Sequence, residues 1–433
     1  MRACSSRWYL SKLRAPRKRH LAHDLPGESW RSACYWGSSL SVSCGCWCSS
    51  WASGSVRPVA VGAVEAVGGQ PSTPSAEVRA GHLTGIGRSR SAGTSAASKA
   101  WPWAVSALTA GAFVAAIVMA PPAAASPVSG LIWLLFLGSS VHVASTAWLY
   151  GLPEVRSYAL QRPLRYVWIP LGLVVAGAPT AALLSPAVMA WLLLPYFAWQ
   201  FFHFQKQNLG MAALAAAAHG VTPLRPVERW ALIVAGVAGI TGLMAHPGLL
   251  QLHIEPHIGA LFAPAALTFA GAVGVGLVSL VRRASHDRPA GFSATYLLSL
   301  LFSLPIFVFR SPYAAVGGMT IAHGFQYLLL MGLIAAGGAR GGARAVRVTL
   351  FGTVALVGGA VLSGASHLHG ASPALRLLFG AYLGVVMAHF VVDAGFWRMR
   401  NAFSRQFIAG HVPYLVPLEG PLPTGDRSPA DIS

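Results

Sequence analysis

Long runs of hydrophobic positions dominate the chain from Trp101 onward. Each run has close to the ~20 residues that an α-helix needs to cross a ~30 Å hydrocarbon core. The pattern predicts an all-α fold, a polytopic transmembrane helix bundle over residues 101–410 with about ten spans. The expected spans are residues 103–122, 131–151, 165–185, 187–207, 229–246, 259–281, 291–309, 313–336, 346–365 and 374–396.

Charged positions between these runs alternate along the chain. Basic clusters follow every second span, and the loops at the other end carry almost no charge, with Glu255, Arg310 and Arg376 as exceptions. This is the positive-inside pattern, and it predicts an even number of spans with both termini in the cytoplasm. The basic clusters are Arg156, Arg162 and Arg165; Lys206, Arg225 and Arg229; Arg282, Arg283 and Arg288; Arg340, Arg344 and Arg347; and Arg398, Arg400 and Arg405.

The first hundred residues differ in kind from the rest. Residues 1–100 are basic and rich in Ser, Arg, Gly and Ala, with no apolar run long enough to span a bilayer. We expect a disordered extension there, or a start codon assigned too far upstream. All five cysteines lie within the first 48 residues, so the hydrophobic body offers no thiolate ligand. Residues 411–433 are expected to form a cytoplasmic tail.

Composition narrows the class of protein. The 433 residues are 55% hydrophobic and 10% charged, against about 25% charged in soluble domains. The net charge of +19 is assigned to membrane topology and to the lipid bilayer as partner, and no nucleic acid is expected. The chain also lacks a phosphate-binding loop, a G-x-S-x-G elbow and a dinucleotide fingerprint in a βαβ context.

Four histidines lie inside the expected spans, one on each of four helices: His142, His203, His323 and His389. Ionisable groups inside a membrane are costly and usually face the bundle interior. All four are on even-numbered spans, which run from outside to inside. At 1.5 Å per residue they lie about 15 to 24 Å from the outer ends. Four imidazoles at similar depth are expected to converge on one point.

Each histidine has a polar companion about one helical turn further on, and so on the same face. A metal-bound imidazole typically donates its other N–H to such a group, so the companions are candidates for that role or for extra ligands. Neutral imidazole suits iron, copper or zinc. The alternative is a structural role, in which each histidine forms a hydrogen bond to a neighbouring helix and binds no metal. The companions are Gln207, Gln326, Tyr327 and Asp393, with Ser145 and Thr146 after His142.

A second group of histidines lies in the outer loops. The spacings H-x-E-x-H, which includes Glu255, and H-x-H are compatible with a second, weaker zinc or copper site, although surface histidines are the default interpretation. These residues are His246, His253, His257, His367 and His369.

Three motifs carry a resemblance. They are H-F-x-x-Q-x-x-G from His203, H-x-x-Q-Y from His323, and H-F-x-x-D-x-x-x-W-R from His389 to Arg398. Over about residues 103–410 the chain resembles an uncharacterised family of bacterial polytopic membrane proteins, which implies the bacterial cytoplasmic membrane as location. The site layout is remotely similar to that of membrane-embedded β-carotene dioxygenases, which hold one iron through histidines from several spans. The chain shares no motif with these dioxygenases that would assign their substrate to it.

These patterns favour an intramembrane metalloenzyme with a histidine-ligated metal. Iron is the first choice, with copper and zinc open, in an oxygenase, hydroxylase or desaturase acting on a lipid or isoprenoid. Three alternatives stay open: a proton- or ion-coupled transporter using the same groups, a haem-binding membrane protein, and a structural membrane protein. The sequence leaves the reaction and the oligomeric state undetermined.

Overall fold

The computed structural model describes residues 94–122, 127–255, 257–337, 341–399 and 401–416. The expected extension up to residue 93, all five cysteines and most of the expected tail lie outside these residues. The first helix begins at Thr94, a few residues before the expected start of the bundle.

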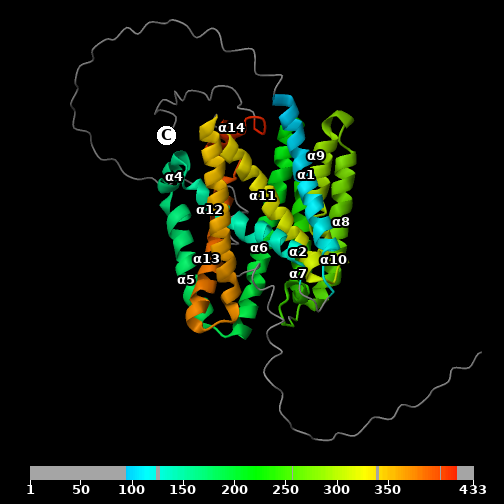
Figure 1. Ribbon diagram of the computed structural model, residues 1–433. Coiled ribbons are helices and arrows are strands. Elements are labelled where there is room, and N and C mark those ends of the chain that lie inside the picture. The colour runs from blue at the N-terminus through cyan, green and yellow to red at the C-terminus, as the bar shows by residue number, and fades with distance from the viewer. Residues whose placement is uncertain (1–93, 123–126, 256, 338–340, 400, 417–433) are drawn as a thin grey trace, which may run out of the picture. The chain divides into compact units, whose positions relative to one another are not determined.

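The described residues form helices and contain no strand (Figure 1). Nine helical segments in the described residues are long and apolar enough to cross a membrane. The predicted all-α polytopic bundle is therefore confirmed. The segments are α1 (Thr94–Val118); α2, η1 and α3 (Ser129–Phe136, Leu137–Val141, His142–Leu149); η2 and α5 (Leu164–Trp168, Ile169–Leu183); α6 (Pro186–Ala218); α7 (Pro226–Ala245); η4 and α8 (Gly259–Leu261, Phe262–Val281); η6 and α11 (Tyr313–Gly317, Gly318–Ala336); α12 and η7 (Gly342–Ser366, His367–Gly370); and α13 (Pro373–Phe396).

The seventh expected span differs from the prediction of one continuous helix over 291–309. It consists of α9 (Ala290–Leu300) and the short α10 (Leu304–Val308), separated by Leu301–Ser303. Pro305 lies in the first turn of α10. A proline has no backbone N–H to donate to the preceding turn, and its ring disfavours helical backbone at the residue before it. The break therefore follows from Pro305.

Proline also marks where several helices begin. It occupies the first turn of α6, α7, α13 and the short α4 (Pro153–Leu160). At this position the missing N–H costs nothing, because the first turn has no intrahelical acceptor for it. At α6 the Ser185 side chain caps the helix by accepting from the backbone N–H of Val188.

Small residues allow neighbouring helices to pack closely. Helix α5 packs along α13, α7 along α8, α1 along α11, and α12 along α3. A Cβ atom on Gly380 would overlap the backbone of Gly177 and Ala178, and one on Gly384 would overlap Val174. Glycine thus lets α5 and α13 approach through their backbones, as is usual in membrane bundles.

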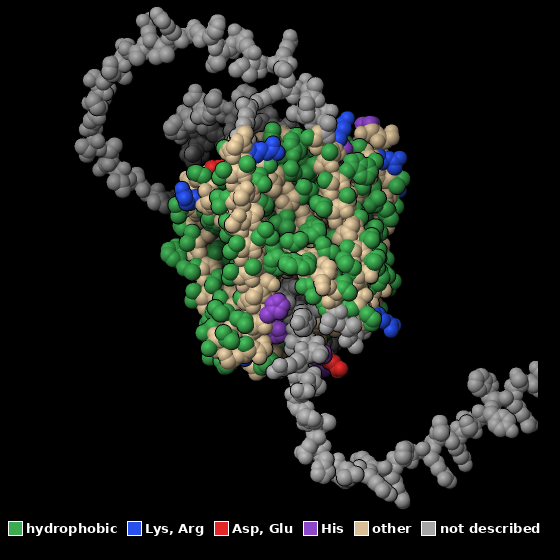
Figure 2. All heavy atoms as spheres, in the orientation of Figure 1, with side chains coloured by type: hydrophobic (Ala, Val, Ile, Leu, Met, Phe, Trp, Pro, Cys, Tyr) green, Lys and Arg blue, Asp and Glu red, His purple; other side chains and the backbone are tan. Residues whose placement is uncertain are grey.

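The surface shows the polarity that a bilayer requires. Figure 2 shows a wide band of hydrophobic side chains, with most of the visible lysines and arginines at one end. Large apolar side chains such as Leu183, Leu267 and Val281 are exposed. In Figure 1 the helices α4, α9 and α14 (Ala402–His411), which follow the connections after α3, α8 and α13, lie at one end of the bundle. We call this end, which carries the arginine-rich connections, the basic end.

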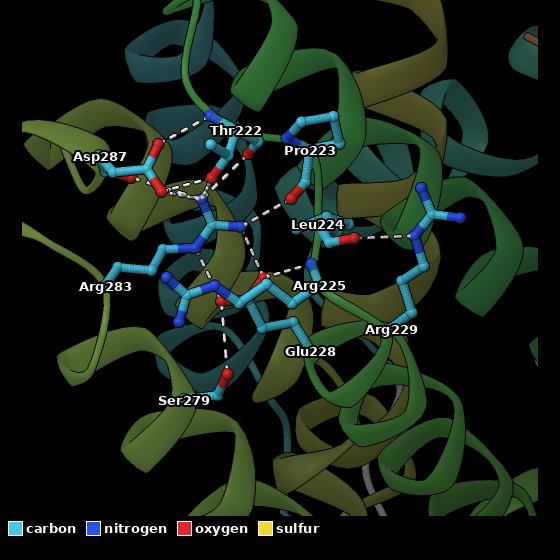
Figure 3. A network of polar contacts seen from close by, with 9 residues as sticks. All are labelled: Thr222, Pro223, Leu224, Arg225, Glu228, Arg229, Ser279, Arg283 and Asp287. Atoms are coloured by element: carbon cyan, nitrogen blue, oxygen red, sulfur yellow. Dashed lines mark hydrogen bonds and ion pairs between the residues drawn. The ribbon is translucent and has the colours of Figure 1, made fainter.

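An ion network ties the α6–α7 connection to the end of α8 (Figure 3). The buried Arg283 guanidinium donates to both carboxylate oxygens of Glu228, at 2.7 and 2.6 Å, and to Asp287 Oδ2 at 3.0 Å. Asp287 Oδ1 accepts from the backbone N–H of Thr222 at 2.7 Å. The hydrogen bonds from Thr222 and the Arg283 charge lower the pKa of Asp287. Paired charges of this kind hold the connection at the basic end in one position.

Candidate metal centre

The four intramembrane histidines lie in one cluster. His142 opens α3, His203 is in the middle of α6, His323 is in α11 and His389 is in α13. Ring centroids are 4.9 Å apart for His142 and His323, 5.0 Å for His323 and His203, 5.2 Å for His203 and His389, and 5.1 Å for His389 and His142. The rings form a closed cycle, so the convergence predicted from their depth is confirmed.

Local backbone features bring His142 and His323 together. The segment η1, which ends just before His142, is a turn of π-helix, a feature common at functional sites. A Cβ on Gly138 would lie 2.6 Å from Ile321 Cα, and a Cβ on Gly324 would overlap the Gly138 backbone. The two glycines therefore permit the close contact between η1 and α11 that places the two imidazoles side by side.

The cluster is buried, and several of its ring nitrogens have no hydrogen-bond partner among the described residues. The exposed fractions are 4% for His142, 7% for His203, 0% for His323 and 3% for His389. Neither ring nitrogen of His323 has a hydrogen-bond partner among the described residues, and the same holds for Nε2 of His203 and of His389. The only groups near the His142 ring that could bond to it among these residues are the backbone groups of Gly138 and Ser139 in its own segment. Buried polar atoms are rarely left unpaired in native proteins, since each costs about 1–3 kcal/mol. These atoms call for a ligand.

Asp393 adds a carboxylate to the cluster. It is 2% exposed, and its Oδ2 lies 3.6 Å from His389 Nε2 and 4.0 Å from His203 Nε2. Two sets of three potential ligands follow, one of His142, His323 and His389, and one of His203, His389 and Asp393. The second set, two histidines and a carboxylate, is the donor set typical of non-haem iron.

A chain of hydrogen bonds sets the orientation of His389. Its Nδ1 lies 2.7 Å from Thr146 Oγ1, which lies 2.9 Å from the Tyr327 hydroxyl, and that hydroxyl donates to Asp393 Oδ1 at 3.0 Å. Each hydroxyl accepts one bond and donates one when Nδ1 carries the proton. The chain then ends on the Asp393 carboxyl group and leaves His389 Nε2 and Asp393 Oδ2 facing the cluster.

The glutamines hold the backbone beside the cluster. The Gln207 amide donates to the carbonyl oxygen of His323 at 2.8 Å and to Gln326 Oε1 at 3.0 Å. The Gln326 amide donates in turn to Thr109 Oγ1 at 2.8 Å. The sequence proposed both glutamines as partners or ligands of the imidazoles. The structure places them as supports of α11 instead.

The donor set fits a single metal ion. The ligand atoms in each set of three lie within 4.8 Å of one another, slightly looser than the 3–4 Å that metal–nitrogen bonds of about 2.1 Å imply. His389 belongs to both sets and turns only Nε2 towards them, because Nδ1 is bonded to Thr146. One nitrogen binds one ion, so the two sets describe one centre.

Two alternatives fit this geometry less well. A haem needs a porphyrin-wide slot between two histidines, whereas here each ring contacts two others edge to face at about 5 Å. A purely structural role requires hydrogen bonds from the rings to other helices, and among the described residues the rings of His142 and His323 make none. The geometry favours an ion over both.

The histidines of the outer loops are not brought together in this way. His246, His253, His257 and His367 are exposed, and His369 is half-buried. His367 and His369 contact the carbonyl oxygens of Ser363 and Ser366 through Nδ1. Neither set of three potential ligands found in the described residues includes an outer-loop histidine. The second site proposed from the sequence has no support in this arrangement.

Two phenylalanines complete the cluster and were missed from the sequence. Phe204 stacks on His323 with ring centroids 4.0 Å apart, and Phe390 packs on His203 at 4.6 Å. Each directly follows a histidine in the chain, so the recurring His-Phe pair was the available signal. The aromatic rings exclude water and fix the planes of the imidazoles.

A cavity of about 550 Å³ adjoins the cluster. His203, Gln207, Tyr327 and Asp393 line one part of it, and α6, α7, α11, α13 and α14 (Ala402–His411) supply its walls. Its size is within the range of small-molecule sites. The cluster is thus buried but adjoins a space that a ligand can occupy.

The chain matches no protein-family model, no curated protein and no solved structure. The function therefore has to be inferred from the residues of this chain and their geometry.

Proposed function

We propose that the protein is an intramembrane metalloenzyme of the non-haem iron type, an oxygenase, hydroxylase or desaturase acting on a lipid or isoprenoid. His142, His203, His323 and His389 would hold the ion, with Asp393 as neighbouring carboxylate. The observation that carries the proposal is the closed cycle of four buried imidazoles, in which both ring nitrogens of His323 and the Nε2 atoms of His203 and His389 have no hydrogen-bond partner among the described residues.

Iron is proposed over copper or zinc because of the donor set and the reaction. Two histidines and a carboxylate are the donor set of non-haem iron oxygenases, whereas copper(I) prefers sulfur donors, which neither set of ligands contains. Zinc has no redox chemistry to offer an oxygenase. Bound iron would supply the redox chemistry that an apolar C–H bond requires. The protein's own part would be to hold the ligands, exclude water and receive an apolar substrate in the adjoining cavity.

The resemblance to bacterial polytopic membrane proteins supports the bacterial cytoplasmic membrane as location. A proton- or ion-coupled transporter is the second candidate, because α9 and α10 form a broken helix and such helices bind ions in transporters. However, neither set of ligands includes a residue of this pair, and none lines the cavity. The break is therefore separate from the histidine cluster.

Metal analysis of the purified protein tests the proposal. We expect about one iron per chain, an optical spectrum without haem bands, and complete loss of iron in His389→Ala. Asp393→Asn should weaken binding about 10–100-fold, as changes next to a ligand do. His246→Ala is the matched control, because it removes an exposed histidine of the outer loops.

Several results would contradict the proposal. Wild-type protein that stays free of metal after reconstitution with Fe(II) would exclude a metal centre. Equal loss of iron in His246→Ala and His389→Ala would exclude this cluster as its location. Stoichiometric zinc or copper after purification and reconstitution would show that the cluster binds a metal and that this metal is not iron.

A further inference from the structure

The cavity beside the cluster has two chemically distinct ends. His203, Tyr327 and Asp393 line it and are buried, so they form its inner end. Lys206 and Arg229 also line it and are exposed, and Arg398 is half-buried, so these three cations form its rim at the basic end. The cavity thus extends from the histidine cluster to a rim that carries three positively charged side chains.

The charge balance at the rim favours an anion. The residues that line the cavity include these three cations and one acidic residue, Asp393, which belongs to the inner end. Arg229 Nε donates to the carbonyl oxygen of Leu224 at 3.1 Å, and Arg398 Nε to that of Ala394 at 3.0 Å. These bonds hold both guanidinium groups beside the opening, where they attract phosphate or carboxylate groups.

The walls between the two ends are apolar. They include Leu209, Met211, Leu214 and Leu330. A soluble anion would gain nothing from these side chains, whereas a hydrocarbon body would bury its surface against them at about 25 cal/mol per Å². The combination of rim and walls matches an amphiphile.

We propose that the cavity binds an amphiphile with an anionic head group at the rim and its adjoining apolar carbons at the histidine cluster. This assignment rests on the proposed function and specifies its substrate class. Lys206 is three residues from His203 on α6, or about 4.5 Å along the axis, and Arg398 is five residues from Asp393. The carbons presented to the cluster therefore lie about 5–8 Å from the head group rather than far down the chain.

Calorimetric titration of the protein in neutral maltoside micelles tests this assignment. The probes are octyl phosphate, octyl phosphocholine and inorganic phosphate. We expect octyl phosphate to bind most tightly, with affinity about fivefold lower in each of Lys206→Gln, Arg229→Gln and Arg398→Gln, and about 50-fold or more lower in the triple variant. Arg282→Gln is the control, because Arg282 is an exposed arginine at the same end that does not line the cavity.

The outcomes separate this inference from the metal centre, because iron is measured in the same samples. Equal binding of octyl phosphate and octyl phosphocholine, or an equal loss in Arg282→Gln, would overturn the anionic head group while leaving an iron-loaded centre intact. Inorganic phosphate binding as tightly as octyl phosphate would overturn the amphiphile. Tight, selective binding of octyl phosphate by a protein that cannot be loaded with metal would support the ligand site and refute the enzyme.

Discussion

At the scale of single residues, the chemistry of this protein depends on which atom each side chain turns to its neighbours. His389 and Asp393 are one turn apart on α13, and each has one polar atom in the chain through Thr146 and Tyr327 and the other facing the cluster. A carboxylate at this depth is costly unless it is bonded. The Tyr327 hydroxyl supplies that bond and keeps Asp393 beside the imidazoles.

Breaking this chain should weaken the centre without removing it. Thr146→Val removes the hydroxyl that contacts His389 Nδ1, and Tyr327→Phe removes the hydroxyl that links Thr146 to Asp393. The ligands remain in both variants. We expect iron affinity to fall about 10–100-fold in each variant, measured by competition with a chelator. Thr241→Val is the control, since the Thr241 hydroxyl donates to the Val237 carbonyl oxygen of its own helix α7, away from the histidine cluster. Unchanged affinity in both variants would mean that the chain does not orient His389.

At the scale of helices, close backbone contact sets the distances in the centre. The π-helical turn η1 and α11 touch through Gly138 and Gly324, one turn before His142 and directly after His323 respectively. Any side chain there would separate the two helices. The position of two ligands is thus controlled by residues that carry no chemistry of their own.

A single methyl group tests this contact. Gly324→Ala places a Cβ on the backbone of Gly138, so we expect a lower melting temperature and substantial loss of bound iron. Gly332→Ala on the same helix has open space around its Cβ, so it should keep its iron and gain slightly in stability from the better helix propensity of alanine. Full iron content in Gly324→Ala would show that η1 and α11 can separate without opening the cluster.

At the scale of the whole molecule, topology depends on the broken seventh span. The described residues contain nine long apolar segments together with the α9–α10 pair. Counted as one crossing, this pair gives ten crossings and returns both ends of the bundle to the same side. The alternation of basic connections supports this count.

Reporter fusions placed after successive segments can check the count. We expect fusions after Glu255 and Arg310 to report the outside, and fusions after Arg288 and Arg344 to report the cytoplasm. The fusions after Arg288 and Arg310 flank the α9–α10 pair. If these two reported the same side, the pair would not cross the membrane, and the predicted cytoplasmic location of both termini would be wrong.

The sequence alone determined the class of fold and the ligands of the candidate centre. Hydrophobic length decides whether a segment can cross a bilayer, and the cost of burying an ionisable group decides that His142, His203, His323 and His389 face inward. Both are properties of a segment and its solvent. They can therefore be read without knowing which helices are neighbours.

Only the tertiary structure decided how those groups are connected. Thr146 follows His142 by one turn but bonds to His389, and it meets a tyrosine 181 residues away in the chain. Gln207 and Gln326 bond to each other and to backbone rather than to imidazoles. Helical period specifies the face of a helix, but the partner across that face depends on helix packing. That packing also creates the cavity, whose basic rim includes Lys206, one turn from His203 on α6.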